Sequence, residues 1–159
     1  MAYIFYNPNP VAANVADCSV RAIAKALNIS WEDAYIKLTI NGINMGDIIA
    51  NDNVWGSVLR QNGFYKEVIP NTCPDCYTVD NFCQDNPTGI YVLGFGGHVA
   101  TVVNGDLYDS WDSSKLIPVY YWYRKEISDG LISGVSGPES EPAQSGELPT
   151  ASVPVQPNV

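Results

Sequence analysis

Two segments of alternating residues, HVATVV at 98–103 and DLYDSW at 106–111, are separated only by Asn104-Gly105. This dipeptide is the strongest short signal for a tight β-hairpin, because both residues tolerate the positive φ angles that a two-residue turn requires. Such a turn sets the register of the two strands, and strand parity then decides which side chains share a face. The hairpin therefore constrains both the fold of this region and the side chains that can meet within it.

The register places the single histidine of the chain, His98, near one particular carboxylate. Counting back from the turn, His98 shares a sheet face with Asp109 and Trp111. The neighbouring carboxylates Asp106 and Asp112 fall on the opposite face. Asp109 is then a diagonal neighbour of His98, at about 7–8 Å between backbones and within reach of its side chain. The turn geometry predicts that Asp109 orients the imidazole.

The remaining segments divide into helices first and strands second. Apolar periodicity and capping signals predict helices at 17–28, with Asp17 as N-cap, at 30–42, with Asn41-Gly42 as its end, at 53–61 and at 78–84. Extended segments are predicted at 65–69, 89–95, 98–103, 106–111 and 119–124. This order predicts an α+β domain in which N-terminal helices pack on a C-terminal antiparallel sheet.

The C-terminal composition separates a tail from the folded part of the chain. From Gly134 onward the sequence carries three glutamates, several prolines, no lysine or arginine and no aromatic residue. Such a segment buries too little apolar surface to offset its ordering entropy. With 159 residues, 46% of them hydrophobic, we expect one folded domain at 1–133 and a disordered acidic tail at 134–159.

Charge and hydropathy narrow the classes of partner. Seventeen acidic and eight basic residues give a formal net charge of -9, which argues against nucleic acid or anionic lipid as a partner. No apolar run approaches the roughly 20 residues of a membrane helix, and the N-terminal MAYIFYNPNP lacks the features of a signal peptide. We therefore expect a cytoplasmic monomer with reduced thiols, acting on a peptide or protein substrate.

Cys18 falls in the first turn of the first predicted helix, where a thiol has unusual chemistry. Unpaired backbone N–H groups and the positive end of the helix dipole both favour the thiolate there. Together with an oriented His98–Asp109 pair, Cys18 would complete a nucleophilic triad. The same N–H groups would stabilise an oxyanion, with a second donor from an upstream amide. The candidate amides are Asn7, Asn9 and Asn14.

These residues resemble the papain-like cysteine peptidases. The family has a Cys at the start of its first long helix and a His on a later strand, here after Gly96-Gly97. Asp109-Ser110-Trp111 stands where the family typically has Asn-Ser-Trp. The segments DCSVRAIAKAL and GGHVATVVNGDLYDSWDSS look most like short papain-like domains of bacteriophages and mobile elements, related to bacteriocin-leader peptidases. The resemblance covers roughly residues 7–112.

The resemblance implies a role for each residue and a location in the cytoplasm of a bacterial host. Cys18 is the nucleophile, His98 the general base and acid, and Asp109 the orienting residue. Trp111 shields the His–Asp bond from water. Such an enzyme cleaves a peptide or isopeptide bond and needs no metal or organic cofactor. Four residues are candidates for the substrate cleft: Arg21, Gly96, Gly97 and Trp111.

One departure from the family pattern keeps a second hypothesis open. Papain-like enzymes usually place a Gln about six residues before the Cys, and this chain has Ala12 there. The alternative is a weak or inactive papain-like module that holds a host protein in its cleft. A third hypothesis is transfer of the acyl group to an amine instead of water. For Arg21 the alternative is a solvated position on the polar face of its helix.

The CPDC segment, Cys73 to Cys76, invites a metal or redox interpretation. A structural zinc site needs four ligands. Cys83 would be a third, but His98 is already assigned and the chain has no second CxxC motif. The segment also lacks the strand and helix that flank a thioredoxin-like motif. We therefore expect CPDC to stiffen a loop and expect no metal site.

Overall fold

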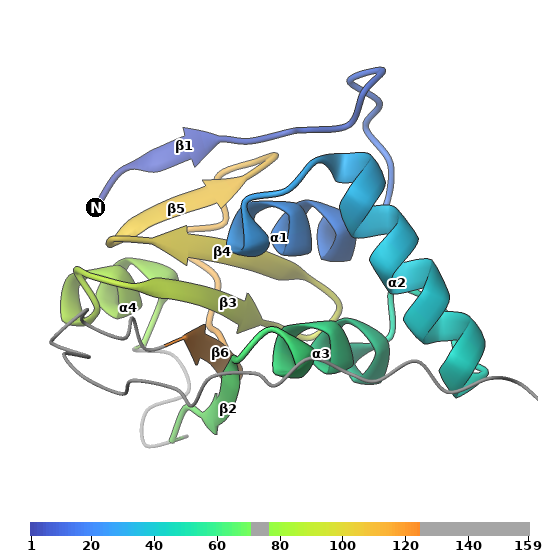
Figure 1. The fold of residues 1–159 in the computed structure, drawn as a ribbon. Helices are drawn as coiled ribbons and strands as arrows, with labels where there is room; N and C mark the ends of the chain where they lie inside the picture. Colours follow the sequence, from blue (N-terminus) through green and yellow to red (C-terminus); the bar gives the residue numbers. More distant parts are fainter. Residues whose placement is uncertain (71–76, 125–159) are drawn as a thin grey trace, which may run out of the picture. The chain divides into compact units, whose positions relative to one another are not determined.

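The computed structural model describes residues 1–70 and 77–124 (Figure 1). The elements in chain order are β1 (Tyr3–Phe5), α1 (Cys18–Leu27), α2 (Trp31–Met45), α3 (Asp52–Gln61), β2 (Tyr65–Val68), α4 (Val79–Asp85), β3 (Ile90–Gly94), β4 (Val99–Val103), β5 (Asp106–Asp109) and β6 (Tyr120–Arg124). The predicted α+β class is confirmed. The predicted tail at 134–159 lies outside the described residues.

The strands form one sheet in the order β1-β5-β4-β3-β6-β2. The expectation of a purely antiparallel sheet was wrong, because β1 pairs in parallel with β5 while the other pairs are antiparallel. A strand of three residues is too short to show the alternation that reveals a strand in a sequence. It exists because Tyr3 and Phe5 pair with Leu107 and Asp109, far along the chain.

The β4–β5 hairpin has the predicted turn and register. Asn104 and Gly105 have φ angles of 51° and 77°, as a turn with two positive φ angles requires. Val103 pairs with Asp106, and Thr101 pairs with Tyr108. The faces deduced from the sequence are therefore the faces of the structure.

The sheet carries helices on both faces (Figure 1). The alternation of side chains along β3 illustrates this, since Val92 packs with α1, α2 and α3 while Leu93 packs with α4. Trp122 of β6 belongs to the first of these two clusters. The first cluster places α1, α2 and α3 against the central strands.

α2 continues to Met45 and ends at Gly46, whose φ of 65° is left-handed. The prediction that Asn41-Gly42 ends this helix was wrong. Gly42 is buried within the helix, and a Cβ at this position would lie 2.7 Å from the Asp47 carbonyl oxygen. Glycine is therefore needed at position 42 because the loop after the helix packs closely against it. A tertiary contact of this kind leaves no local signal in the sequence.

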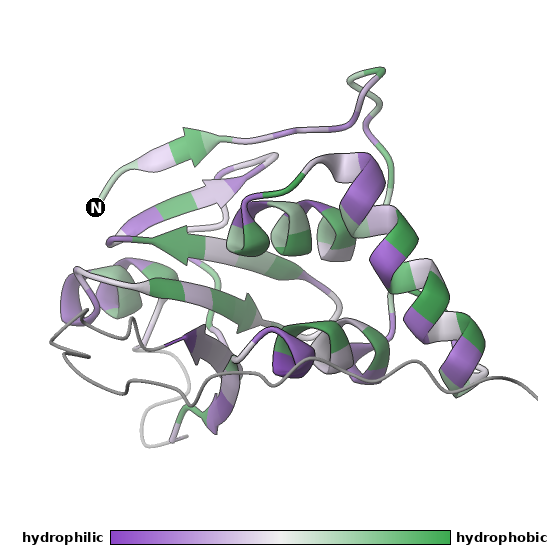
Figure 2. Cartoon of the chain, in the orientation of Figure 1, coloured by the Kyte–Doolittle hydropathy of each residue, from purple (hydrophilic) through white to green (hydrophobic). Residues whose placement is uncertain are grey.

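The N-terminus of α2 is capped as predicted, since the Ser30 side chain accepts a hydrogen bond from the Asp33 N–H at 3.0 Å. Ala34 and Leu38 are the fully buried side chains of this helix. Green and purple bands alternate along α2 in Figure 2. Its outer face carries three exposed apolar residues: Ile36, Ile40 and Ile43. Among residues 1–70 and 77–124, no helix has the length and apolar character needed to cross a membrane.

Candidate active site

Cys18 is the first residue of α1, as predicted. Burial alone would raise the pKa of its thiol, but a hydrogen bond with His98 and the positive charge of that imidazole lower it. Hydrogen bonds from the backbone at Val99 and Ser19 lower the pKa further. The net result is a thiol pKa below its ordinary value. The helix N-terminus and the start of β4 together favour the thiolate.

His98 is held in the short loop between β3 and β4. The Phe95 N–H donates to the His98 carbonyl at 3.0 Å, and the Gly97 N–H donates to the Phe95 carbonyl at 2.9 Å. Two aromatic rings lie near the imidazole, with centroids 5.7 Å away for Phe95 and 5.3 Å away for Trp111. The loop and these rings fix the ring plane of the only histidine.

Asp109 contacts His98, as the hairpin register predicts. The His98 Nε2 atom lies 2.6 Å from Asp109 Oδ2, and the carboxylate is almost fully buried. Burial lowers the pKa of His98, but hydrogen bonds with Asp109 and Cys18 and their charges raise it to about 9. The imidazole is therefore protonated at neutral pH and lies between an acidic thiol and a carboxylate.

The Asp109 carboxylate has two further donors that the sequence analysis missed. The Ser110 N–H donates to Oδ1 at 2.7 Å, and the buried Ser113 hydroxyl donates to Oδ2 at 2.6 Å. The segment DSWDSS is rich in residues that bond to nearby backbone and side chains, but the shape of the turn after β5 decides which serine reaches Asp109. Ser113 is thus part of the site.

Two of the three candidate oxyanion amides are engaged elsewhere. Asn7 donates from Nδ2 to the Ala13 carbonyl at 3.2 Å. Asn9 donates from Nδ2 to Asp17 at 3.4 Å and accepts the Ala13 N–H at 3.3 Å. These side chains organise the loop that leads to Cys18. Asn14 is exposed in the same loop and remains the candidate for the second donor.

Arg21 is buried on α1. It is 7% exposed and forms an ion pair with Asp17, so its alternative as a solvated residue was wrong, while its assignment to the cleft stays a prediction. Asp17 stands at the N-cap position but makes no side-chain cap hydrogen bond. Its carboxylate instead binds the guanidinium, the Trp31 indole N–H at 2.9 Å and the Asn9 amide. A buried charge is satisfied by its strongest available donors.

The other three cleft candidates lie beside His98. Gly96 and Gly97 are exposed, and a Cβ at either position would meet no atom within 4 Å. Trp111 is 46% exposed, and its ring is tilted relative to the imidazole by 42°. An open glycine loop and an exposed indole therefore border the imidazole, which is a geometry that leaves room for a substrate backbone.

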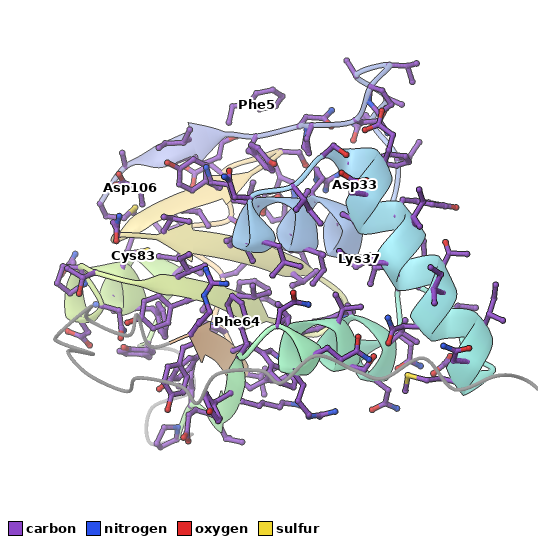
Figure 3. The ribbon with its side chains drawn as sticks, in the orientation of Figure 1. Phe5, Asp33, Lys37, Phe64, Cys83 and Asp106 are labelled. Carbon is purple, nitrogen blue, oxygen red and sulfur yellow. The ribbon has the colours of Figure 1, made fainter. Side chains whose placement is uncertain are left out.

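The remaining cysteines give no second reactive site within the described residues. Cys83 is buried, and burial, followed by the charge of Asp80, raises the pKa of its thiol to about 11. It lies on α4 beside the β4–β5 turn (Figure 3). His98 precedes β4, at the opposite end of the hairpin. Cys73 and Cys76 lie outside the described residues. Over residues 1–70 and 77–124, no group of three or more His, Cys, Asp and Glu side chains is arranged to hold a metal ion.

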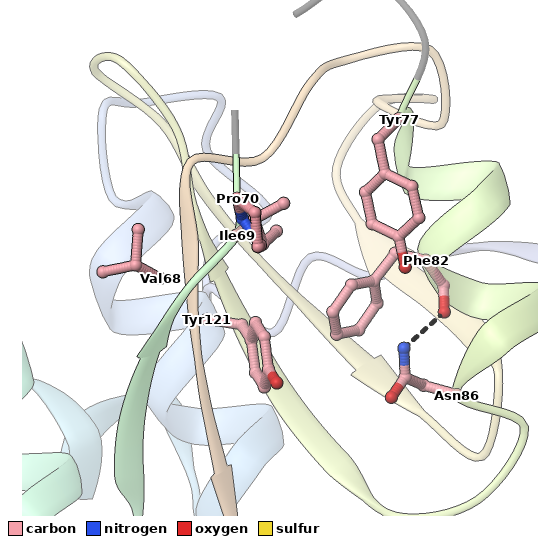
Figure 4. Close-up of a pocket in the computed structure, with 7 residues that line it drawn as sticks. All are labelled: Val68, Ile69, Pro70, Tyr77, Phe82, Asn86 and Tyr121. Carbon is pink, nitrogen blue, oxygen red and sulfur yellow. Dashed lines mark hydrogen bonds between the residues drawn. The ribbon is translucent and has the colours of Figure 1, made fainter. Parts of the chain in front are cut away.

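A separate pocket of about 350 Å³ lies on the α4 side of the sheet. Asn86 closes one side of it and donates to the Phe82 carbonyl at 2.9 Å (Figure 4). Its lining is mostly aromatic and aliphatic and includes none of the three candidate catalytic residues: Val68, Ile69, Pro70, Tyr77, Phe82, Asn86 and Tyr121. The pocket is therefore distinct from the site around His98.

No family model, curated protein or solved structure matches this chain. The functional argument therefore depends on the geometry of the site itself. That geometry joins a helix N-terminal thiol, an imidazole and a buried carboxylate, and these are the three groups of a nucleophilic triad.

Proposed function

We propose that this chain is a papain-like cysteine peptidase that cleaves a peptide or isopeptide bond of a cytoplasmic substrate. The observation that carries the proposal is the position of His98 between two partners. Its Nε2 atom contacts Asp109 at 2.6 Å, which leaves Nδ1 for the hydrogen bond with Cys18. A thiol of lowered pKa beside an imidazole of raised pKa is the resting state of a thiolate–imidazolium enzyme.

The first half of the reaction forms a thioester. The Cys18 thiolate attacks the carbonyl carbon of the scissile bond, and the carbonyl oxygen becomes an oxyanion. The protonated His98 then gives its proton to the leaving amine as the carbon–nitrogen bond breaks. The acyl group stays on sulfur, and the amine product leaves.

The second half of the reaction releases the acyl group. His98, now neutral, takes a proton from a water molecule, which attacks the thioester carbonyl. The sulfur leaves as the thiolate, and the thiolate–imidazolium pair is restored. Asp109 keeps the ring oriented through both halves and stabilises its positive charge. An amine in place of water would give acyl transfer by the same steps.

The oxyanion donors follow from the loop before α1. The Cys18 backbone N–H at the N-terminus of α1 is the first donor. Asn14 is the best second donor, because Asn7 and Asn9 already bind the loop. The commitment of those two amides, with Ala12 at the usual Gln position, favours the second candidate function: an inactive papain-like module that binds a protein partner in its cleft.

Alkylation of Cys18 by iodoacetamide, followed by peptide mass mapping between pH 5 and 9, tests the activated thiol. We expect Cys18 to react rapidly at pH 6, and His98→Ala to abolish this reactivity. Cys83, with its raised pKa, is the internal control. Asp109→Asn should slow the reaction, whereas Asp106→Asn, on the other face of the hairpin, should not. If the alkylation rate of Cys18 instead rises with a midpoint at about pH 8.5, and His98→Ala leaves this midpoint unchanged, the proposal is refuted.

Acyl turnover separates an enzyme from a binding module. The wild-type protein should release several equivalents of nitrophenol from 4-nitrophenyl acetate, because His98 activates water for deacylation. Cys18→Ala should release none above background. An activated Cys18 that is acylated once and not turned over would favour the binding module.

A further inference from the structure

Ser113 is a fully buried serine in the turn after β5, with 0% of its surface exposed. Its Oγ atom lies 2.6 Å from Asp109 Oδ2. This is the same oxygen that lies 2.6 Å from His98 Nε2. One carboxylate oxygen thus faces two partners, one of which is the imidazole of the proposed active site.

The direction of the Ser113 hydrogen bond is determined by chemistry. An ionised carboxylate only accepts hydrogen bonds, so the hydroxyl must be the donor. The oxygen–oxygen distance lies in the range of hydrogen bonds to charged acceptors, which are about twice as strong as neutral ones. The single hydroxyl proton is therefore committed to Asp109.

The carboxylate needs two anchors to hold its orientation. The terminal torsion of an Asp side chain has a broad, nearly two-fold preference, so a carboxylate held at one oxygen still turns about that bond. The Ser110 N–H holds Oδ1 at 2.7 Å. Ser113 holds Oδ2, and the two contacts together fix the plane in which the carboxylate meets His98.

We propose that Ser113 is a positioning residue that holds the Asp109 carboxylate with Oδ2 directed at His98 Nε2. This inference rests on the proposed function for its catalytic meaning, because a fixed imidazole matters only if His98 transfers protons. Its geometric part is independent of that function. A serine that merely closed the turn would leave the behaviour of His98 unchanged when its hydroxyl is removed.

NMR titration of His98 tests the proposal directly, because the chain has a single histidine. In Ser113→Ala we expect the His98 pKa to fall by about one unit, since a carboxylate that turns away stabilises the imidazolium less. In the same variant, alkylation of Cys18 at pH 6 should slow by up to about tenfold as the His98 pKa falls. Ser114→Ala is the matched control, since Ser114 is also buried but its backbone N–H and its side chain bond to Asp112 instead of Asp109. It should leave both quantities unchanged.

A double-mutant cycle shows whether Ser113 acts through Asp109. In an Asp109→Asn background, Ser113→Ala should cause no further change in the His98 pKa, because the two effects share one route. Ser113→Thr retains the hydroxyl and should restore the wild-type titration. Near-UV circular dichroism checks the fold, and Ser113→Cys, with a much weaker donor of similar shape, replaces the alanine variant if that variant unfolds.

The outcomes separate this inference from the proposed function. A His98 pKa in Ser113→Ala that equals or exceeds the wild-type value would overturn the positioning role, while an activated Cys18 in the wild type would leave the proposed function standing. An ordinary Cys18 titration in the wild type would refute the function. A lowered His98 pKa in Ser113→Ala would still support the positioning of the carboxylate.

Discussion

The Thr101 hydroxyl of β4 donates a hydrogen bond to the Ala22 carbonyl of α1 at 3.0 Å, inside the core. The bond joins the sheet to the middle of the helix. The Ala22 carbonyl that accepts it also belongs to the backbone hydrogen-bond pattern of the helix. Because α1 begins at Cys18 and β4 directly follows His98, this contact holds the helix and the strand that carry two groups of the site.

Removing that hydroxyl should weaken both the fold and the site. Thr101→Val keeps the shape of the side chain, so we expect a loss of about 1 kcal/mol in the free energy of unfolding, measured by urea denaturation. Cys18 should also alkylate more slowly at pH 6, because α1 and β4 lose a shared restraint. Thr39→Val is the control, since the Thr39 hydroxyl bonds only within α2, to the Tyr35 carbonyl. Equal effects of the two variants on Cys18 would contradict this role.

The coupled titration of Cys18 and His98 gives an unusual dependence of stability on pH. The folded-state pKa of His98, about 9 against about 6.5 unfolded, gives stability that is complete below pH 6.5 and is lost as pH rises through 9. The lowered pKa of Cys18 has the opposite slope, because its stability is present at high pH and lost as pH falls. The two slopes oppose each other in the wild type.

Removing the thiol should expose the slope of the imidazole. In Cys18→Ala, His98 loses the contribution of Cys18 to its raised pKa but keeps that of Asp109. The free energy of unfolding should still fall as pH rises above about 6.5, and more steeply than in the wild type, because the opposing contribution of Cys18 is gone. Urea denaturation at several pH values in this window measures both slopes. Parallel curves for the two proteins would show that Cys18 and His98 do not form an ion pair.

The buried pair of Asp17 and Arg21 should be far more important for stability than the surface pair of Asp80 and Lys115. Asp17→Ala leaves a buried guanidinium without its partner, and we expect a loss of about 3–5 kcal/mol in the free energy of unfolding. Lys115→Ala should cost little, because the lysine is solvated. If urea denaturation shows comparably small losses of unfolding free energy for Asp17→Ala and Lys115→Ala, Arg21 reaches water once its partner is gone.

The two glycines before His98 should respond differently to the same substitution. Gly97 has a φ of 97°, so Gly97→Ala should cost about 1–3 kcal/mol of backbone strain. The strain displaces the neighbouring His98 and should slow alkylation of Cys18. Gly96→Ala places its methyl group in open space and should be nearly neutral. If both variants match the wild type in stability and reactivity, the loop conformation does not set the position of His98.

The parts of the site that could be predicted from the sequence depend on local geometry. A two-residue turn at Asn104-Gly105 determines the register of its own strands, and the contact between His98 and Asp109 follows from that register alone. Cys18 at the start of a helix likewise follows from the periodicity of the residues after it. Such inferences need no knowledge of distant contacts.

The features that the sequence did not reveal depend on tertiary contacts. Gly42 resembles a helix stop until the loop that packs on it is known, and β1 is a strand only because β5 lies beside it. Arg21 faced away from the apolar stripe of its helix, although the i,i+4 spacing from Asp17 was an available signal for a pair. Ser113 required the shape of the turn after β5.

The hydrogen bond between Thr101 and Ala22 joins positions 79 residues apart in the chain. During synthesis, α1 is complete long before the β4–β5 hairpin exists. Until that hairpin docks, Cys18 has neither His98 nor the Val99 backbone beside it and reacts as an ordinary thiol. The proposed reactive centre is therefore completed only after the β4–β5 hairpin has been made, and a nascent chain that stops before this hairpin should carry no activated nucleophile. The onset of rapid Cys18 alkylation at mildly acidic pH would mark the time at which the β4–β5 hairpin docks on α1. The reactivity of this thiol is therefore a probe for the folding kinetics of this protein.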